Sequence, residues 1–250
     1  MQVVVDSLLT SYEVMGEGKL IVLLHGWADR AAGLRSLQVA LAKDFRVVAL
    51  DLPGFGGTQM PPEAWGLDDY AGFAAHFLKK IDAGRVHVLL GHSNGGAIAI
   101  RGLANGLLKA DRLVLMASAG VRGEQKGKLT ALKAVTKVGK VLTTPLPANA
   151  KRKLRGKVYE AAGSDMLVVE EMQETLKRIV VDDVRADAAK LTLPTLLLYG
   201  EDDNATPVSF GKLFHELIKG STLKVFPNAG HFVHLDEAEN VAQTVAEFAR

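Results

Sequence analysis

The segment from Gly91 to Gly96, which reads Gly-His-Ser-Asn-Gly-Gly, is the part of this sequence best suited to nucleophilic chemistry. It directly follows an apolar run, Val86 to Leu90, and precedes a segment with helical spacing, Ala97 to Leu103. A serine at a sharp strand-to-helix turn holds its hydroxyl above the sheet, and the helix N-terminus stabilises a developing oxyanion. Glycines on both sides remove Cβ atoms that such a turn would crowd. Ser93 is therefore the candidate nucleophile, although the bare pattern also fits a glycine-rich turn with a capping serine.

A serine hydroxyl is a weak nucleophile at neutral pH, so it needs a nearby base that is itself oriented by an acceptor. An acidic turn, Gly200 to Pro207, follows the apolar run Thr195 to Tyr199. The carboxyl ends of buried parallel strands are where such sheets bind ligands. His231 follows the last apolar run, Thr222 to Phe226. The chain order serine, acid, histidine is the one expected when the serine lies on a strand-to-helix turn.

Short apolar runs rich in valine and leucine alternate with segments of helical spacing, which predicts an α/β fold: a mostly parallel eight-stranded sheet with helices on both faces. The first two strands should form an antiparallel hairpin at one edge. The expected strands are Val3 to Val5, Leu9 to Met15, Leu20 to Leu24, Arg46 to Leu50, Val86 to Leu90, Leu113 to Met116, Thr195 to Tyr199 and Thr222 to Phe226. Apolar stripes mark helices at Tyr70 to Ile81, Phe210 to Leu217 and Val241 to Phe248.

The alternation stops between about Ala119 and Leu191, where helical spacing continues without a convincing strand. We expect a single domain over residues 1–250, with a helical lid at about 119–190 inserted after the sixth strand. The lid halves differ in charge: Val121 to Lys157 holds 11 basic residues and one acid, whereas Val158 to Asp187 holds 8 acids and 3 bases.

Three lysines of the basic half, Lys133, Lys137 and Lys140, share one face of an amphipathic helix. The simpler interpretation is that the opposite, apolar stripe covers the active site and the lysines are solvated. The alternative is contact with an anionic substrate or a membrane surface.

Composition excludes several other classes of function. The chain has 250 residues, 30 basic and 28 acidic side chains and a net charge of +2, so nothing global indicates a nucleic-acid partner. It has no cysteine, which excludes disulfides, thiolate metal sites and a cysteine nucleophile. Met1 to Asp6 shows no secretory signal, and no apolar run is long enough to span a bilayer. We therefore expect a cytoplasmic protein.

Five motifs in order along the chain resemble those of the α/β-hydrolase superfamily, and the resemblance covers nearly the whole sequence apart from the lid. They are the oxyanion loop His25-Gly26-Trp27, the turn Asp51 to Gly56, the nucleophile elbow Gly91 to Gly95, the acid turn Gly200 to Pro207 and the histidine loop Gly230-His231.

The resemblance implies a role for individual residues. Asp203 is the acid, because it lies three residues after Gly200 and four before Pro207, with Asp202 as the alternative. His231 is the base, and the competing His234 would be a surface histidine or one behind the site. The backbone N–H groups of Trp27 and Asn94 would form the oxyanion hole.

For three further polar side chains near these motifs, the simpler interpretation is a structural role. His25 and His92 flank the site and would make structural hydrogen bonds, and Asp51 would satisfy backbone amides in its own turn. The side chain of Trp27 either walls the acyl pocket or packs in the core.

The implied activity is hydrolysis of carboxylic esters through an acyl-enzyme, with a small-molecule ester as substrate and with no cofactor and no metal. The same residues serve carbon–carbon bond hydrolases, lactonases, aminopeptidases and perhydrolases, because substrate choice depends on the lid. A non-catalytic receptor with this fold is a more distant alternative.

Overall fold

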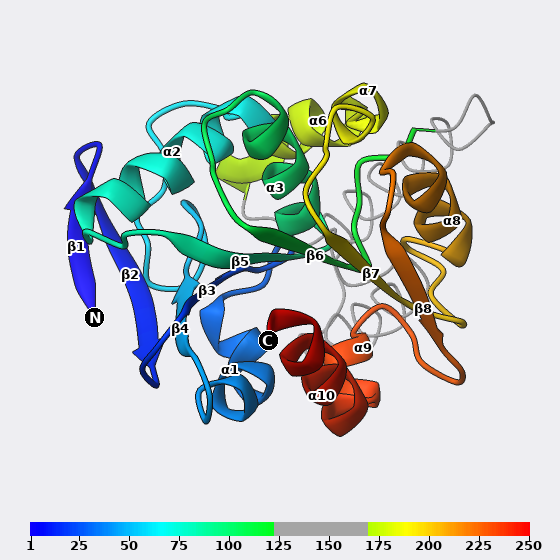
Figure 1. The fold of residues 1–250 in the computed structure, drawn as a ribbon. Coiled ribbons are helices and arrows are strands. Elements are labelled where there is room, and N and C mark those ends of the chain that lie inside the picture. The colour runs from blue at the N-terminus through cyan, green and yellow to red at the C-terminus, as the bar shows by residue number, and fades with distance from the viewer. Residues whose placement is uncertain (123–169) are drawn as a thin grey trace, which may run out of the picture.

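A single eight-stranded sheet forms the centre of the protein in this computed structural model, which describes residues 1–122 and 170–250 (Figure 1). The strand order is β1-β2-β4-β3-β5-β6-β7-β8, and β2 alone runs opposite to the others. The strands are β1 (Gln2–Val5), β2 (Leu8–Met15), β3 (Leu20–Leu24), β4 (Arg46–Leu50), β5 (Val86–His92), β6 (Arg112–Met116), β7 (Thr195–Gly200) and β8 (Thr222–Phe226). All eight expected strands and the edge hairpin are confirmed.

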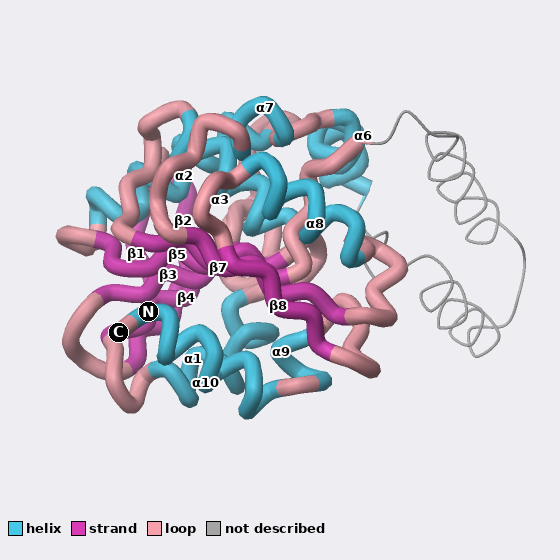
Figure 2. The backbone as a smooth tube through the Cα atoms, turned by 45° about the vertical axis from the view of Figure 1, so that its right-hand side comes forward, coloured by secondary structure: helices cyan, strands magenta, loops and turns pink. Residues whose placement is uncertain are grey.

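Helices cover both faces of this sheet (Figure 2). The helices are η1 (Ala31–Leu34), α1 (Arg35–Leu41), α2 (Leu67–Lys80), α3 (Asn94–Ala104), η3 (Glu170–Met172), α6 (Gln173–Val181), α7 (Arg185–Ala188), α8 (Val208–Leu217), α9 (Val233–Asp236) and α10 (Ala238–Ala249). The central strands β3, β5 and β7 are buried along their whole length, because helices pack against both of their faces. No helix in the described ranges is long and apolar enough to cross a membrane.

Two apolar clusters hold the layers together, one on each face of the sheet. One contains buried side chains of η1, α1, α9 and α10, and the other contains those of α2, α3, α6, α7 and α8. The connection after β3 therefore leads to one face and the connection after β5 to the other (Figure 2). Ligands of open α/β sheets bind where successive connections lead to opposite faces and the strand order reverses, outside the carboxyl ends of the strands.

Part of the expected lid can be compared with the structure. Residues 123–169, which include Lys133, Lys137 and Lys140, lie outside the described residues. The described remainder of the insertion contains η3, α6 and α7 and no strand.

Arg101 joins the end of this insertion to α3. Its side chain is 13% exposed and forms ion pairs with Asp68 at 2.7 Å, Asp182 at 3.1 Å and Asp187 at 2.7 Å. A guanidinium held by three carboxylates from separate elements fixes the chain at 182–187 against the body of the sheet.

The turn from β5 to α3 packs tightly against the end of β3. A Cβ atom on Gly95 would collide with the carbonyl oxygen of Leu24, and one on Gly26 would lie 3.1 Å from the Cβ of Ser93. At Gly95 only glycine permits the approach, because the carbonyl oxygens of Leu24 and His25 belong to the backbone and cannot move aside as a flexible side chain can.

We expect Gly95→Ala to lower the free energy of unfolding by about 1–3 kcal/mol, since the added methyl group overpacks a rigid contact. Gly72→Ala is the matched control, because Gly72 lies inside α2 with open space around its Cβ position. That variant should gain about 0.5–1 kcal/mol from helix propensity. Urea denaturation measures both, and equal stabilities of the two variants would contradict the packing described here.

Candidate active site

Ser93 lies at a strained turn between β5 and α3. Its φ is 50° and its ψ is −117°, a backbone conformation that residues with a Cβ atom rarely adopt. β5 continues through His92 and α3 begins at Asn94, so the reversal of direction is concentrated on the serine itself. The turn places the Ser93 hydroxyl at the carboxyl end of the sheet.

The structure brings together the serine, histidine and acid expected from the sequence. His231 Nε2 lies 3.0 Å from Ser93 Oγ, and His231 Nδ1 lies 2.9 Å from Asp203 Oδ2. Because an ionised carboxylate only accepts, Nδ1 carries the proton and donates to Asp203. Nε2, which then carries no proton, accepts the hydroxyl proton of Ser93. The alternative acid, Asp202, is exposed to solvent.

Asp203 is held ionised by its hydrogen bonds. Burial alone would raise its pKa, but hydrogen bonds from His231 and from the backbone and side chain of Thr206, with the charge of His231, bring the pKa below the ordinary aspartate value. Ala205 and Thr206 donate backbone N–H bonds to Oδ1 at 2.8 Å and 2.9 Å. The carboxylate therefore keeps the negative charge that orients His231.

Thr206 is a residue of this site that the motifs did not single out. Its hydroxyl lies 2.7 Å from Asp203 Oδ2, 2.9 Å from the Ala117 carbonyl and 3.1 Å from His231 Nδ1. One hydroxyl proton can serve one acceptor at a time, so Thr206 also has a lone pair to offer the Nδ1 proton. The hydroxyl thus supports both the acid and the histidine.

Two other histidines make structural hydrogen bonds beside the site. His25 Nδ1 lies 2.7 Å from the Gly26 carbonyl and donates to it, while its Nε2 accepts the N–H of Leu52 at 2.9 Å. Burial lowers the pKa of His25, in keeping with the neutral ring that this pair of bonds requires.

His92 supports the loop that carries His231. Its Nε2 donates to the His231 carbonyl at 3.0 Å, and the two ring centroids are 4.9 Å apart. Burial holds the pKa of His92 well below its usual value, so this ring is also neutral. His234 packs edge-on against His92 and is 1% exposed, so of the two positions expected for it the structure shows the one behind the site and not the surface one.

Asp51 satisfies backbone amides in two segments rather than only in its own turn. Its Oδ2 accepts the N–H of Gly57 at 2.9 Å, and its Oδ1 accepts that of Ala31 at 2.7 Å. The carboxylate therefore ties the turn after β4 to η1, next to the loop after β3.

Two backbone N–H groups are available to stabilise negative charge beside Ser93. Asn94 is the first residue of α3, where no intrahelical acceptor exists for its N–H. Trp27, in the loop after β3, donates its backbone N–H to no oxygen of the described residues. β3 and β5 are neighbours in register, so both donors lie at the same end of the sheet.

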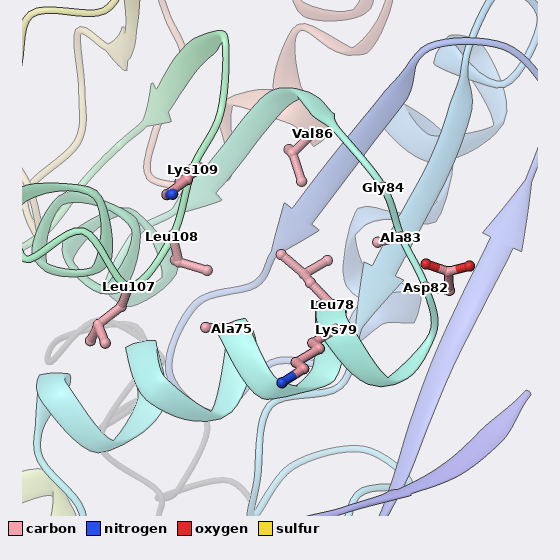
Figure 3. A pocket seen from close by; sticks show the side chains of 10 residues that line it. All are labelled: Ala75, Leu78, Lys79, Asp82, Ala83, Gly84, Val86, Leu107, Leu108 and Lys109. Atoms are coloured by element: carbon pink, nitrogen blue, oxygen red, sulfur yellow. The ribbon is translucent and has the colours of Figure 1, made fainter.

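A separate pocket of about 270 Å³ lies at the opposite end of β5 (Figure 3). It is lined by the end of α2, by Val86 and by Leu107 to Lys109, and contains no serine or histidine. Seven strand residues span roughly 20 Å, so this pocket is remote from Ser93. In residues 1–122 and 170–250, no cluster of three or more His, Asp or Glu side chains could hold a metal ion.

Comparison with known proteins identifies the family. A profile described as "Alpha/beta hydrolase family" matches residues 21–244. The chain belongs to the alpha/beta hydrolase family. This hydrolase is also similar to a solved meta-cleavage product hydrolase from Pseudomonas fluorescens, with a TM-score of 0.76 and 25% identity over 99% of this chain and 96% of that one.

Two relatives with named activities match at similar levels. The 2-hydroxy-6-oxo-2,4-heptadienoate hydrolase of Pseudomonas putida is 27% identical over 98% of this chain and 94% of its own length. The pimeloyl-[acyl-carrier protein] methyl ester esterase of Chromobacterium violaceum is 27% identical over 94% and 96%. The first name describes a hydrolase of a dienoate, and the second an esterase of a methyl ester.

We expect Thr206→Val to lower the rate of Ser93 modification by a fluorophosphonate by roughly 10-fold to 100-fold, because it removes a hydrogen bond to a charged carboxylate worth about 1.5–3 kcal/mol. Thr206→Ser should restore most of the rate. Thr195→Val is the matched control, since the buried Thr195 hydroxyl also donates to a backbone carbonyl but lies at the start of β7. Loss of rate in the control as large as in Thr206→Val would contradict this role.

Proposed function

We propose that this hydrolase cleaves carboxylic esters through an acyl-enzyme formed on Ser93. The observation that carries the proposal is the continuous chain of hydrogen bonds from Ser93 Oγ through His231 to Asp203, at 3.0 Å and 2.9 Å. A serine next to a neutral, oriented imidazole is the arrangement that activates a hydroxyl near neutral pH.

Acylation begins when Ser93 Oγ attacks the ester carbonyl carbon while its proton passes to His231 Nε2. The carbonyl oxygen gains negative charge, which the N–H groups of Trp27 and Asn94 stabilise. The imidazolium is stabilised by Asp203, whose pKa lies below the ordinary value. The intermediate collapses, the carbon–oxygen bond to the alcohol breaks, and His231 returns its proton to the departing oxygen.

Deacylation repeats these steps with water as the nucleophile. His231 Nε2 takes a proton from the water, whose oxygen attacks the acyl carbon. Collapse of the second intermediate releases the carboxylic acid and returns the proton to Ser93 Oγ.

We also propose that the insertion after β6 acts as a lid over this site. Its described part supports the idea: Met172 of η3 is buried in the same apolar cluster as Trp27 and Leu52. Thr175 of α6 accepts the backbone N–H of Trp65 at 3.1 Å. The insertion therefore contacts the loop that follows β4, at the carboxyl end of the sheet.

Carbon–carbon bond hydrolysis is the second candidate, favoured by the similarity to the heptadienoate hydrolase. The same serine and histidine would serve, but the leaving group would be a carbon atom that His231 protonates. The methyl ester esterase, at the same identity, favours the ester reaction. A direct assay of both bond types separates the two.

We expect Ser93→Ala to lose most of its turnover of phenyl and p-nitrophenyl esters. The remaining rate should exceed that of the reaction in water by at most ~10³–10⁴-fold, which binding and the oxyanion donors alone can supply. Asp203→Asn should lower kcat roughly 10⁴-fold, because the amide favours the wrong imidazole tautomer. Steady-state kinetics measures both. The control is Asp202→Asn, which alters the neighbouring exposed acid and should retain wild-type kcat.

A fluorophosphonate should label the wild-type protein on the peptide that contains Ser93 and should not label Ser93→Ala. A folded wild-type protein that neither reacts with this probe nor cleaves any ester would contradict the proposed function. Cleavage of dienoate carbon–carbon bonds without cleavage of esters would select the second candidate.

A further inference from the structure

Two buried side chains next to Ser93 have polar atoms without a hydrogen-bond partner. Asn94 is 4% exposed, and neither its Nδ2 nor its Oδ1 has a partner among the described residues. Trp27 is 5% exposed, and its Nε1 likewise has none. A buried polar group left unpaired costs folding free energy, so such groups in a native protein require an explanation.

The two side chains come from equivalent places on neighbouring strands. Leu24 of β3 pairs with Gly91 of β5, and Trp27 and Asn94 each lie three residues beyond that pair. A Cβ atom on Gly26 would lie 3.1 Å from the Cβ of Ser93, so the two connections touch. Trp27 and Asn94 therefore flank the nucleophile from two sides of one narrow junction.

The direction of the Asn94 side chain follows from its position in α3. Side chains of a helix are tilted toward its N-terminus, and Asn94 is the first residue of α3. Its carboxamide therefore extends toward the end that carries Ser93. Ala97 and Ile98, one turn later on the same face, belong to the apolar cluster that also contains Trp27. No group of the described residues satisfies the carboxamide there.

Neither residue has a structural role that explains its polar atoms. Ser93, not Asn94, is the N-cap of α3, and the helix has no side-chain cap. The Trp27 ring packs edge-on against Phe55 at 4.9 Å, a contact that a phenylalanine would also make. The apolar packing would be served as well by residues without these N–H and C=O groups.

We infer that the Asn94 carboxamide and the Trp27 indole N–H form a polar subsite for the acyl group of the substrate. The subsite binds an uncharged oxygen, a ketone or a hydroxyl, within a few bonds of the scissile carbonyl. Asn94 Nδ2 and Trp27 Nε1 donate to that oxygen, and a hydroxyl can in addition donate to Asn94 Oδ1. This inference rests on the proposed function, because it specifies the acyl group that Ser93 receives.

The charges of the described residues favour a neutral group over a carboxylate. No Lys or Arg is among the fully buried residues of the described ranges. The partly buried Arg101 is held by three carboxylates, and Arg122 donates to the carbonyl oxygens of Ile179 and Asp182. Among residues 1–122 and 170–250, a carboxylate in the subsite would therefore find no fully buried cation to pair with it.

Such a subsite discriminates strongly, because a substrate without the oxygen leaves the buried donors unpaired. The test uses two matched pairs of phenyl esters: levulinate against valerate, and β-hydroxybutyrate against butyrate. Each kcat/KM is divided by the rate of alkaline hydrolysis of the same ester, which removes intrinsic reactivity. We expect the wild-type protein to favour the oxygenated ester of at least one pair by 10-fold or more.

Asn94→Leu should reduce that preference ratio at least 10-fold, and Trp27→Phe should reduce it in the same direction. The ratio is the readout because any change in the oxyanion donors affects both members of a pair equally. Gln38→Leu is the matched control: Gln38 Oε1 is also buried and unpaired, but Gln38 lies in α1 on the other face of the sheet. This control should leave the ratio unchanged.

The melting temperature is a second readout. If Asn94 had a structural role, its replacement by leucine would lower the Tm. Replacing an unpaired buried amide with an apolar side chain of similar shape is neutral or stabilising, so the Tm of Asn94→Leu should equal or exceed that of wild type. A wild-type protein that cleaves both esters of each pair at equal corrected rates would overturn the inference and leave the proposed function standing. An unchanged ratio in both variants, or a fall in the Tm of Asn94→Leu, would also overturn it.

Discussion

The close contact between the turn after β5 and the end of β3 is the constraint on which the rest of the site depends. Ser93 holds a backbone conformation that is costly for a residue with a side chain, and the backbone of Gly95 packs directly against the carbonyl of Leu24. Because of this contact, the Ser93 turn and the loop after β3 lie together at the point where the strand order of the sheet reverses. The loops after β7 and β8 then need only to present an acid and an imidazole to a fixed position.

Much of the fold could be predicted because its signals are local. Each central strand is a short apolar run, and each of the three predicted helices has an apolar stripe; these features depend on neighbouring residues alone. The residues of the candidate site could be predicted for the same reason: Ser93, Asp203 and His231 each lie in a short motif that follows a strand. The register of parallel strands then brings their carboxyl ends to one edge of the sheet.

The remaining features depend on contacts between distant segments, which no local pattern records. The short helices α1 and α9 have few turns in which a stripe could repeat, so their packing on the sheet decides their existence. The bond from His92 to the His231 carbonyl joins residues 139 positions apart, and it makes a structural histidine part of the support for the base. The unpaired atoms of Asn94 are likewise visible only once its neighbours are known.

The central claim is that the hydroxyl of Ser93, with His231 as its base, takes up the acyl group of the substrate to form a covalent acyl-enzyme. Rapid chemical quenching of the protein during turnover of p-nitrophenyl acetate, followed by mass spectrometry of its peptides, tests this most directly. Our account predicts an acetyl group on Ser93 that appears with the first turnover and decays once the substrate is exhausted. Ester turnover with no acyl group on Ser93, or with the acyl group on another residue, would contradict it.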